Sequence, residues 1–301
     1  MSTKPLTTAQ FFRKFPDDET CLQHLFDVRF GQGFGCPACE RQSKWFRIKA
    51  ERAYSCQWCG HHLHPTVGTP FEQTRTPLQL WFYAIHLFTT TRHGVSAKEL
   101  QRQLGVTYKT AWRMASLIRE HMADVDGEAP LGGLGRTVQI DETFVGGRTK
   151  REKHGGDPAA NKATVFGMLE VGGDLVAHVV PNRTSGTLLP MIRATVKKAS
   201  TIHTDEHRAY GGLATLGYRH QTVNHSQEEY VSLTTGATVN GIENFWRHLK
   251  CSIKGTHTSV STKHLVHYVK EFEYRFNRRD RPEAMLPELL STFRPLTAKR
   301  G

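Results

Sequence analysis

The sequence predicts an α/β domain built on a mixed sheet, with its first three strands antiparallel and helices on its flanks. A small zinc ribbon and a helix-turn-helix are expected before it. Three observations lead to this prediction: two C-x2-C pairs, two adjoining helical patterns, and an alternation of strand and helix patterns further on. The expected boundaries are 1–70 for N-terminal helices and the ribbon, 71–125 for the helix-turn-helix region, 126–136 for a linker, and 137–301 for the sheet domain with a C-terminal helix.

The composition indicates a globular chain with an acidic partner. The 301 residues carry a formal net charge of +12, with a pI near 9.5, and 38% of them are hydrophobic. This basic balance favours nucleic acid as the partner, although a merely basic globular protein would share it. No apolar run approaches the roughly 20 residues of a membrane-spanning helix, and Met1–Gln10 lacks the apolar core of a signal peptide. We therefore expect a cytoplasmic protein.

Four of the six cysteines stand in two close pairs, Cys36 with Cys39 and Cys56 with Cys59. Sixteen residues separate the pairs, which is the spacing of a four-thiolate zinc site. Two residues between cysteines let a tight turn direct both sulfurs at one ion, and two such turns complete a tetrahedron. Strand patterns between the pairs predict a zinc ribbon that holds one structural Zn²⁺.

Three histidines follow the second cysteine pair closely: His61, His62 and His64. They could also bind zinc, but four cysteines already fill a tetrahedral shell, so we leave them out of the predicted site. The alternative for the cysteines is two redox-active pairs, which the paired spacing disfavours.

The stretch 96–114 has the order of a helix-turn-helix. Ser96 with Glu99 predicts a capping box at the start of the first helix, Gly105 predicts the turn, and Thr107 predicts the cap of the second helix. An ordinary helical hairpin is the alternative. The residues expected to meet base edges or phosphates lie near the start of the second helix: Tyr108, Lys109 and Arg113.

A short strand pattern over 138–147 ends at a glycine pair and carries Asp141 where a core strand ordinarily carries Val or Ile. Because strand side chains alternate, Asp141 and Glu142 point to opposite faces and cannot serve one site. A buried carboxylate is costly unless it is paired or holds a cation. The alternative for Asp141, taken alone, is a strand-end Asp that caps the following turn.

Carboxylates also follow the fourth predicted strand and stand in a late helix, at Asp205 and Glu243. Three acids at one sheet edge ionise together only if cations sit among them, which points to Mg²⁺. A basic loop at 148–162 carries Lys150 and Arg151, which either contact DNA or are simply solvated. The further predicted elements are strands at 163–171, 175–180, 201–204 and 222–224, and helices at 187–199, 240–253 and 262–278.

Four blocks of the sequence resemble bacterial insertion-sequence transposases of the DDE class, in the ISXO2-like group with an N-terminal zinc ribbon and a ribonuclease H-like catalytic domain. With the ribbon, the resemblance covers roughly residues 15–280. The order of the last three blocks is its most specific part. The blocks are Ile140–Gly147, His203–Tyr210, Val239–Lys250 and Glu271–Arg279.

The resemblance implies hydrolysis at element ends and strand transfer into target DNA, with the terminal inverted repeats and target DNA as partners and a homodimer or higher oligomer on DNA. It implies that Asp141, Asp205 and Glu243 hold two catalytic Mg²⁺ ions, which Mn²⁺ could replace. It also implies that Lys250 contacts element-end DNA. Residues 243 and 250 are seven apart, about two helical turns, so they share one face. Asn240 stays open as an alternative third ligand, because it lies three residues before Glu243.

Two other functions compete with a transposase. A DNA-binding regulator derived from a transposase would combine the ribbon and the helix-turn-helix with a dead catalytic domain, and should lack at least one acid, whereas all three are present. A metal-dependent nuclease that cuts without joining would use the same acids, so the sequence does not separate it from a transposase.

Overall fold

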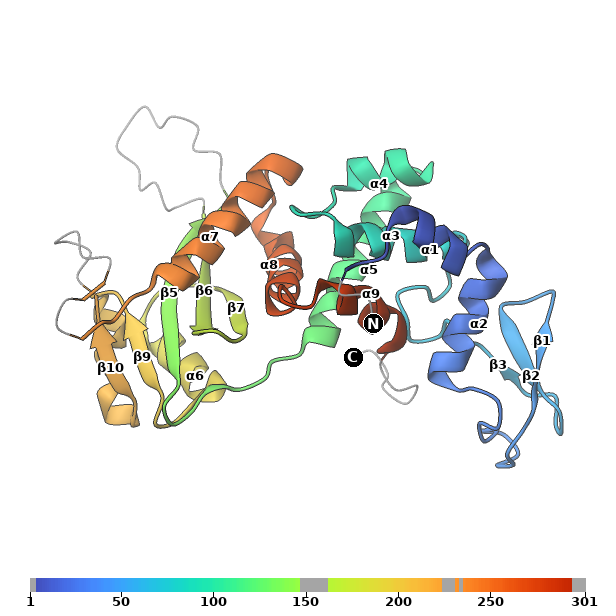
Figure 1. The fold of residues 1–301 in the computed structure, drawn as a ribbon, viewed down its shortest axis with the longest axis horizontal. Helices are drawn as coiled ribbons and strands as arrows, with labels where there is room; N and C mark the ends of the chain where they lie inside the picture. Colours follow the sequence, from blue (N-terminus) through green and yellow to red (C-terminus); the bar gives the residue numbers. More distant parts are fainter. Residues whose placement is uncertain (1–3, 147–161, 224–230, 233–234, 294–301) are drawn as a thin grey trace. The chain divides into compact units, whose positions relative to one another are not determined.

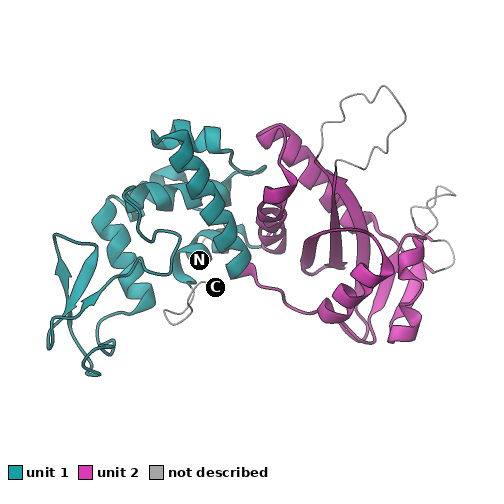
Figure 2. Ribbon diagram, turned by 180° about the vertical axis from the view of Figure 1, so that it is seen from behind, with its two compact units in different colours: residues 1–125, 280–301 teal, residues 126–279 magenta. Residues whose placement is uncertain are grey.

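The structure, a computed structural model, describes residues 4–146, 162–223, 231–232 and 235–293. The chain divides into two compact units, Met1–Val125 together with Asp280–Gly301, and Asp126–Arg279 (Figure 2). No helix in the described part of the chain is both long enough and apolar enough to cross a bilayer.

The first unit begins with two capped helices, α1 (Thr8–Lys14) and α2 (Asp18–Arg29). Thr7 and Gln10 form a reciprocal capping box on α1, and the Asp17 side chain accepts from the backbone N–H of Thr20 on α2. The apolar helix α3 (Leu78–Thr90) is buried along much of its length. These helices supply the core on which the rest of the unit packs.

The zinc ribbon is a three-stranded antiparallel sheet in the order β1 (Trp45–Ile48), β2 (Ala53–Cys56) and β3 (His62–Leu63). Tyr54 of β2 stacks on Phe26 of α2 with ring centroids 4.0 Å apart, so the ribbon is joined to the helical core by aromatic packing. The predicted strands between the cysteine pairs are confirmed within one residue at each end.

Two helices follow where the helix-turn-helix was predicted, α4 (Ala97–Leu104) and α5 (Tyr108–Asp126). Ser96 caps α4 by accepting from the N–H of Glu99, but the Glu99 side chain turns to Arg102 and Gln103, so the reciprocal half of the predicted capping box is wrong. Gly105 ends α4 in the left-handed conformation, at φ 66°, which a glycine adopts without strain.

The C-terminal segment belongs to the first unit, whereas the sequence assigned it to the sheet domain. Its helix α9 (Met285–Ser291) buries Leu289 and Leu290 against α2 and α3. His24 and His121 lie at 3.2 and 2.9 Å from the carbonyl oxygens of Leu290 and Leu289. The residues that pack on the apolar side of α9 therefore lie much earlier in the sequence, so the local hydrophobic pattern does not indicate which unit α9 joins.

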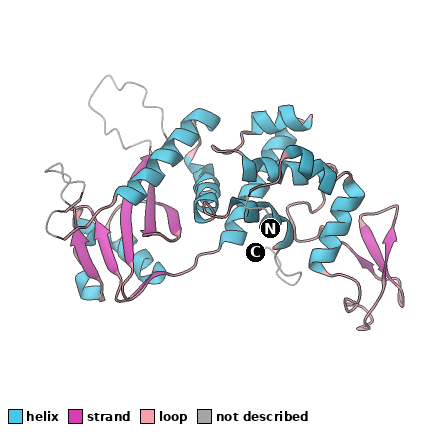
Figure 3. Ribbon diagram, viewed as in Figure 1, coloured by secondary structure: helices cyan, strands magenta, loops and turns pink. Residues whose placement is uncertain are grey.

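The second unit contains a five-stranded mixed sheet in the order β10-β9-β5-β6-β7 (Figure 1, Figure 3). Its first three strands are antiparallel, as the sequence predicted, and β9 and β10 run parallel to β5, which makes the sheet mixed. The last strand starts three residues earlier than predicted and is preceded by two 3₁₀ turns, η1 (Arg208–Tyr210) and η2 (Ala214–Leu216). The five strands are β5 (Thr137–Val145), β6 (Ala163–Glu170), β7 (Leu175–Val180), β9 (Thr201–Thr204) and β10 (Arg219–Thr222).

Helices cover both faces of this sheet and create two cores (Figure 1). On one face, α6 (Ser185–Thr195) packs on Val138 and Ile140 of β5. On the other, α7 (Asn240–Ser252) and α8 (Thr262–Asn277) pack around Trp246. A π-helical turn, η4 (Ile253–His257), continues α7. The predicted alternation along β5 is therefore confirmed.

Helix α8 covers the open edge of the sheet at β7. The Glu273 carboxylate accepts from the backbone N–H of Ala177 at 3.0 Å, and Asn277 bonds both backbone groups of Leu175 at 2.8 and 3.0 Å. These side chains replace the missing neighbouring strand, which otherwise leaves edge groups open to pairing with another chain. The fourth sequence block thus has a structural role.

The predicted linker is partly structured. Helix α5 extends to Asp126, and β4 (Leu131–Gly132) pairs in parallel with β8 (Val196–Lys197), so only a short connection remains between the units. Gly132 has φ 73°, and a Cβ there would lie 2.3 Å from the Ser200 hydroxyl, so glycine fits this close approach.

Candidate catalytic and metal-binding sites

The four cysteines of the ribbon converge, and their Sγ atoms all lie within 4.8 Å of one another. The Sγ atoms of Cys36 and Cys59 lie 3.6 Å apart, and those of Cys39 and Cys56 lie 3.9 Å apart. In a tetrahedral site with Zn–S bonds of about 2.3 Å, neighbouring sulfurs are about 3.8 Å apart. The cluster therefore fits one structural Zn²⁺.

Local hydrogen bonds favour the thiolate form at one of these cysteines. Desolvation raises the pKa of Cys56, but hydrogen bonds from Ser43 and from the backbone N–H groups of Cys59 and Trp58 outweigh it and lower the pKa to about 6. Since zinc binds the thiolate, this environment prepares Cys56 for the metal.

Asp141 lies in the middle of β5, opposite Gly167 of β6. Its carboxylate Oδ2 accepts a hydrogen bond from the indole Nε1 of Trp246 at 3.0 Å. A Cβ on Gly167 would lie 2.6 Å from the Trp246 ring, so the absence of a side chain at 167 is what lets the indole reach Asp141. Trp246 is buried in the core, but its polar contact with Asp141 was not predicted from the sequence.

A second contact fixes the start of α7 against β5. The side-chain Oε1 of Gln139 accepts from the backbone N–H of Ile242 at 3.1 Å, which satisfies one of the free donors at the helix N-terminus. A Cβ on Gly241 would lie 2.6 Å from that oxygen, so a side chain there would displace the Gln139 amide. Glu243 stands in the first turn of α7. Asn240 is the first residue of the helix, and Val239 is its N-cap.

The other predicted acids act electrostatically on Asp141. Burial first, and then the carboxylates of Glu142, Asp205 and Glu243, raise the pKa of Asp141 to about 7, against a hydrogen bond from the Glu142 backbone. In the described part of the chain, the donor groups whose atoms all lie within 4.8 Å of one another are the four cysteines and a His/Glu group on the ribbon. The three acids are thus neighbours whose oxygens stand further apart than that.

Glu142 points to the opposite face of β5 and is nearly inaccessible, with 2% of its side chain exposed. Its Oε2 accepts from the hydroxyl of Tyr210, and its Oε1 lies 3.6 Å from Arg183 and 3.7 Å from Nδ1 of His207. Burial raises its pKa, and Asp205 acts in the same direction. His207 also donates its backbone N–H to the Asp205 carboxylate at 3.0 Å. Beyond the alternation of strand side chains, no sequence signal identified this cluster.

Comparisons with known proteins agree with these features. Residues 130–277 match the family described as ISXO2-like transposase domain, and residues 16–62 match the transposase zinc-ribbon domain. A transposase-like protein of Haemophilus influenzae is 38% identical over 102 residues, which cover 34% of this chain and 80% of that protein. The chain belongs to the ISXO2-like transposase family. This transposase is also 26% identical, over 283 residues, to a protein in the transposable element ISH50 of Halobacterium salinarum, covering 87% of this chain and 92% of that protein.

Lys250 of the transposase lies two turns after Glu243 on α7 and has an exposed side chain. Partial desolvation lowers its pKa, while Asp141 raises it and Lys162 lowers it. Asp141 therefore lies within electrostatic reach of this lysine. Lys250 lines a cavity of about 210 Å³ together with Phe144, Val145, Gly146, Ile253, Lys254, Thr258 and Ser259.

The residues predicted to contact DNA at the second helix of the helix-turn-helix are exposed at the start of α5. Tyr108 is 47% exposed, with the Lys98 ammonium 5.0 Å from its ring centroid, and Lys109 and Arg113 are exposed too. Trp112 on the same stretch is 41% exposed and was not singled out from the sequence. The predicted contacts Lys150 and Arg151 lie outside the described residues.

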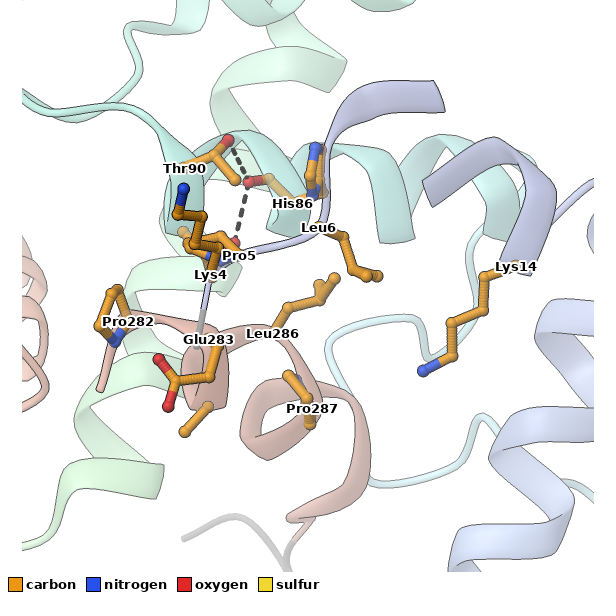
Figure 4. Close-up of a pocket in the computed structure, with 12 residues that line it drawn as sticks. Lys4, Pro5, Leu6, Lys14, His86, Thr90, Pro282, Glu283, Leu286 and Pro287 are labelled. Atoms are coloured by element: carbon orange, nitrogen blue, oxygen red, sulfur yellow. Dashed lines mark hydrogen bonds between the residues drawn. The ribbon is translucent and has the colours of Figure 1, made fainter. Parts of the chain in front are cut away.

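A larger cavity of about 460 Å³ lies within the first unit of the transposase (Figure 4). Helix α3 contributes His86, whose carbonyl oxygen accepts from the hydroxyls of Thr89 and Thr90, while Leu6 and Leu286 supply apolar walls. None of the predicted acids or DNA contacts lines it. Although this cavity is the larger of the two, its lining residues do not support a catalytic role.

Proposed function

We propose that this transposase holds two Mg²⁺ ions with Asp141, Asp205 and Glu243, hydrolyses the phosphodiester at each element end and transfers the freed strand into target DNA. The observation that carries the proposal is the buried Asp141 carboxylate, whose pKa is raised to about 7 by burial first and by its acidic neighbours, Asp205 and Glu243 among them, second. A cation beside these acids would stabilise the ionised form of Asp141.

Bound Mg²⁺ would stabilise the attacking and the leaving oxygen of an in-line displacement at phosphorus. The chain's own residues orient the acids and the DNA. Trp246 donates to one oxygen of Asp141 and so limits its rotation. Lys250, on the same helix as Glu243, is suited to bind a phosphate of the element end. Cleavage frees a 3′-hydroxyl, and the same acids serve its attack on target DNA, so no serine or tyrosine nucleophile is required.

We also propose a ribonuclease H-like fold for the second unit and DNA recognition by the first. The sheet order β7-β6-β5-β9-β10, with three antiparallel strands and then two parallel ones, supports the fold. The exposed basic and aromatic residues at the start of α5 support a helix-turn-helix that reads the terminal inverted repeats. Because an element has two ends, the working form is proposed to be a dimer or higher oligomer on DNA.

The test is a strand-transfer assay with labelled element-end DNA and Mg²⁺. Asp141→Asn and Asp205→Asn should lose cleavage and joining by about a thousandfold or more while still retarding the DNA in a gel, because an amide replaces a charged metal ligand. Asp174→Asn, an exposed acid in the β6–β7 turn, is the matched control and should stay active. Full Mg²⁺-dependent cleavage by either active-site variant would overturn the assignment. Cleavage without joined product by the unaltered protein would favour a nuclease.

The third ligand is tested separately. Glu243 acts electrostatically on Asp141, whereas Asn240 is an exposed first residue of α7. Mg²⁺ also prefers charged oxygen to a neutral amide. Glu243→Gln should therefore lose nearly all cleavage, and Asn240→Ser should lose little. The reverse outcome would move the ligand to Asn240 and leave the reaction unchanged.

A further inference from the structure

Three exposed side chains converge on the outer face of the zinc ribbon: Glu51 from the turn after β1, and His62 and His64 at β3. Because strand side chains alternate, the two histidines share one face while Leu63 between them is buried on the other. The Glu51 Oε2 lies 3.4 Å from Nδ1 of His62, and the two imidazole centroids are 6.4 Å apart. One donor atom from each residue lies within 4.8 Å of the other two.

We propose that Glu51, His62 and His64 form a second zinc site on the ribbon, independent of the four cysteines. Two imidazole nitrogens and one carboxylate oxygen are a ligand set that Zn²⁺ accepts with a fourth position left to water. With Zn–N and Zn–O bonds of about 2.0–2.1 Å, tetrahedral ligand atoms lie about 3.3–3.4 Å apart. The separation of 3.4 Å between Glu51 and His62 equals this edge, and exposed His64 closes the triangle by rotating its side chain.

An ordinary ion pair does not account for the arrangement. It would explain the approach of Glu51 to His62 but not the presence of His64 beside both. An exposed ion pair of this kind contributes little to stability. Bound zinc would instead connect the β1–β2 turn to β3, a strand of only two residues, and so restrain the least paired strand of the ribbon.

The site is distinct from the cysteine cluster in chemistry and in strength. None of its ligands is a thiolate, and only three protein ligands are present, so it should exchange metal more readily than the closed four-cysteine site. His61 provides a matched control, because it is adjacent in sequence but lies outside the group. Its backbone carbonyl accepts from the N–H of Cys56 at 2.9 Å, and its backbone also hydrogen-bonds Cys59. Alanine preserves both backbone contacts.

The first experiment measures zinc in the full-length protein after dialysis against micromolar Zn²⁺ without chelator. We expect two ions per chain in the unaltered protein, one in the double variant His62→Ala, His64→Ala, and two in His61→Ala. Glu51→Gln should weaken the second ion at least tenfold. One ion per chain in the unaltered protein, two in the double variant, or equal loss in His61→Ala would each overturn the proposal.

The second experiment uses Co²⁺ in place of zinc, which separates the two ligand sets by their spectra. Thiolate ligation gives intense near-ultraviolet charge-transfer bands, whereas nitrogen and oxygen ligation gives only weaker visible bands. The first equivalent should produce the thiolate bands and the second should add visible absorption alone. In the double variant the thiolate bands should remain, which also reports a folded ribbon, and the second component should vanish. Loss of thiolate bands would mean that the histidines serve the cysteine site, and the proposal would fail.

Discussion

Asp141→Asn should stabilise the Mg²⁺-free protein while it abolishes cleavage. Burial and three neighbouring carboxylates raise the pKa of Asp141 from 3.8 to about 7 in the folded chain. Between these values the folded state keeps a proton that the unfolded state has lost. The stability of the metal-free protein therefore falls as the pH rises through this window and levels off above pH 7. Asparagine does not titrate, so the variant does not lose stability in this way as the pH rises.

The size of the effect follows from the width of the window. One pKa unit corresponds to about 1.4 kcal/mol. Between pH 5 and pH 7 the free energy of unfolding of the variant, relative to that of the wild type, should therefore increase by about 3 kcal/mol. Added Mg²⁺ should narrow this advantage at pH 8. An ion that binds only the folded wild-type site at ten times its Kd stabilises it by about 1.4 kcal/mol, and the variant should gain little.

The assay is hydrogen exchange of β6 peptides in increasing urea, because it reports the unit that contains Asp141 and leaves the zinc in the ribbon undisturbed. Both proteins are measured from pH 5 to pH 8 without Mg²⁺ and then with it. Asp174→Asn is the control, since its side chain is exposed in a turn and should show no pH-dependent advantage. If Asp141→Asn and the wild type keep a constant difference across this range, Asp141 does not lie in a buried cluster of acids.

Three further outcomes are expected. Replacing Cys36 and Cys56 together by serine should remove the structural zinc and unfold the ribbon, and metal analysis with circular dichroism checks this. Gly167→Ala should cost about 1–3 kcal/mol by overpacking against Trp246 and should slow cleavage, as urea unfolding and the cleavage assay measure; adding Trp246→Phe should recover part of the stability. Lys109→Ala should weaken binding to element ends and reduce its salt dependence, and a titration at several salt concentrations that shows no change would contradict a role in recognition.

The parts of the structure that follow from short-range pattern were predictable from the sequence. The cysteine spacing indicated the ribbon, and period-2 alternation correctly separated Asp141 from Glu142. The sequence did not predict features that depend on residues far apart in the chain. Helix α9 joins the first unit through contacts with residues more than 160 positions away in sequence, such as His121 with Leu289. The contact between Trp246 and Asp141 depends on the β5–β6 register, which brings Gly167 opposite the acid.

Two adjacent carboxylates on β5 differ in how their charge is compensated, and this difference indicates which one needs a metal ion. Glu142 has a hydroxyl donor and two basic side chains close by, on Arg183 and His207. On the other face Asp141 receives an indole N–H and feels Lys250 electrostatically, while Asp205 and Glu243 add negative charge. Asp205 acts on both carboxylates, but Glu243 acts on Asp141 in addition, so the charge of Asp141 is the less compensated of the two. Since a buried charge without a counter-charge is unstable, that face is where a divalent cation would contribute most.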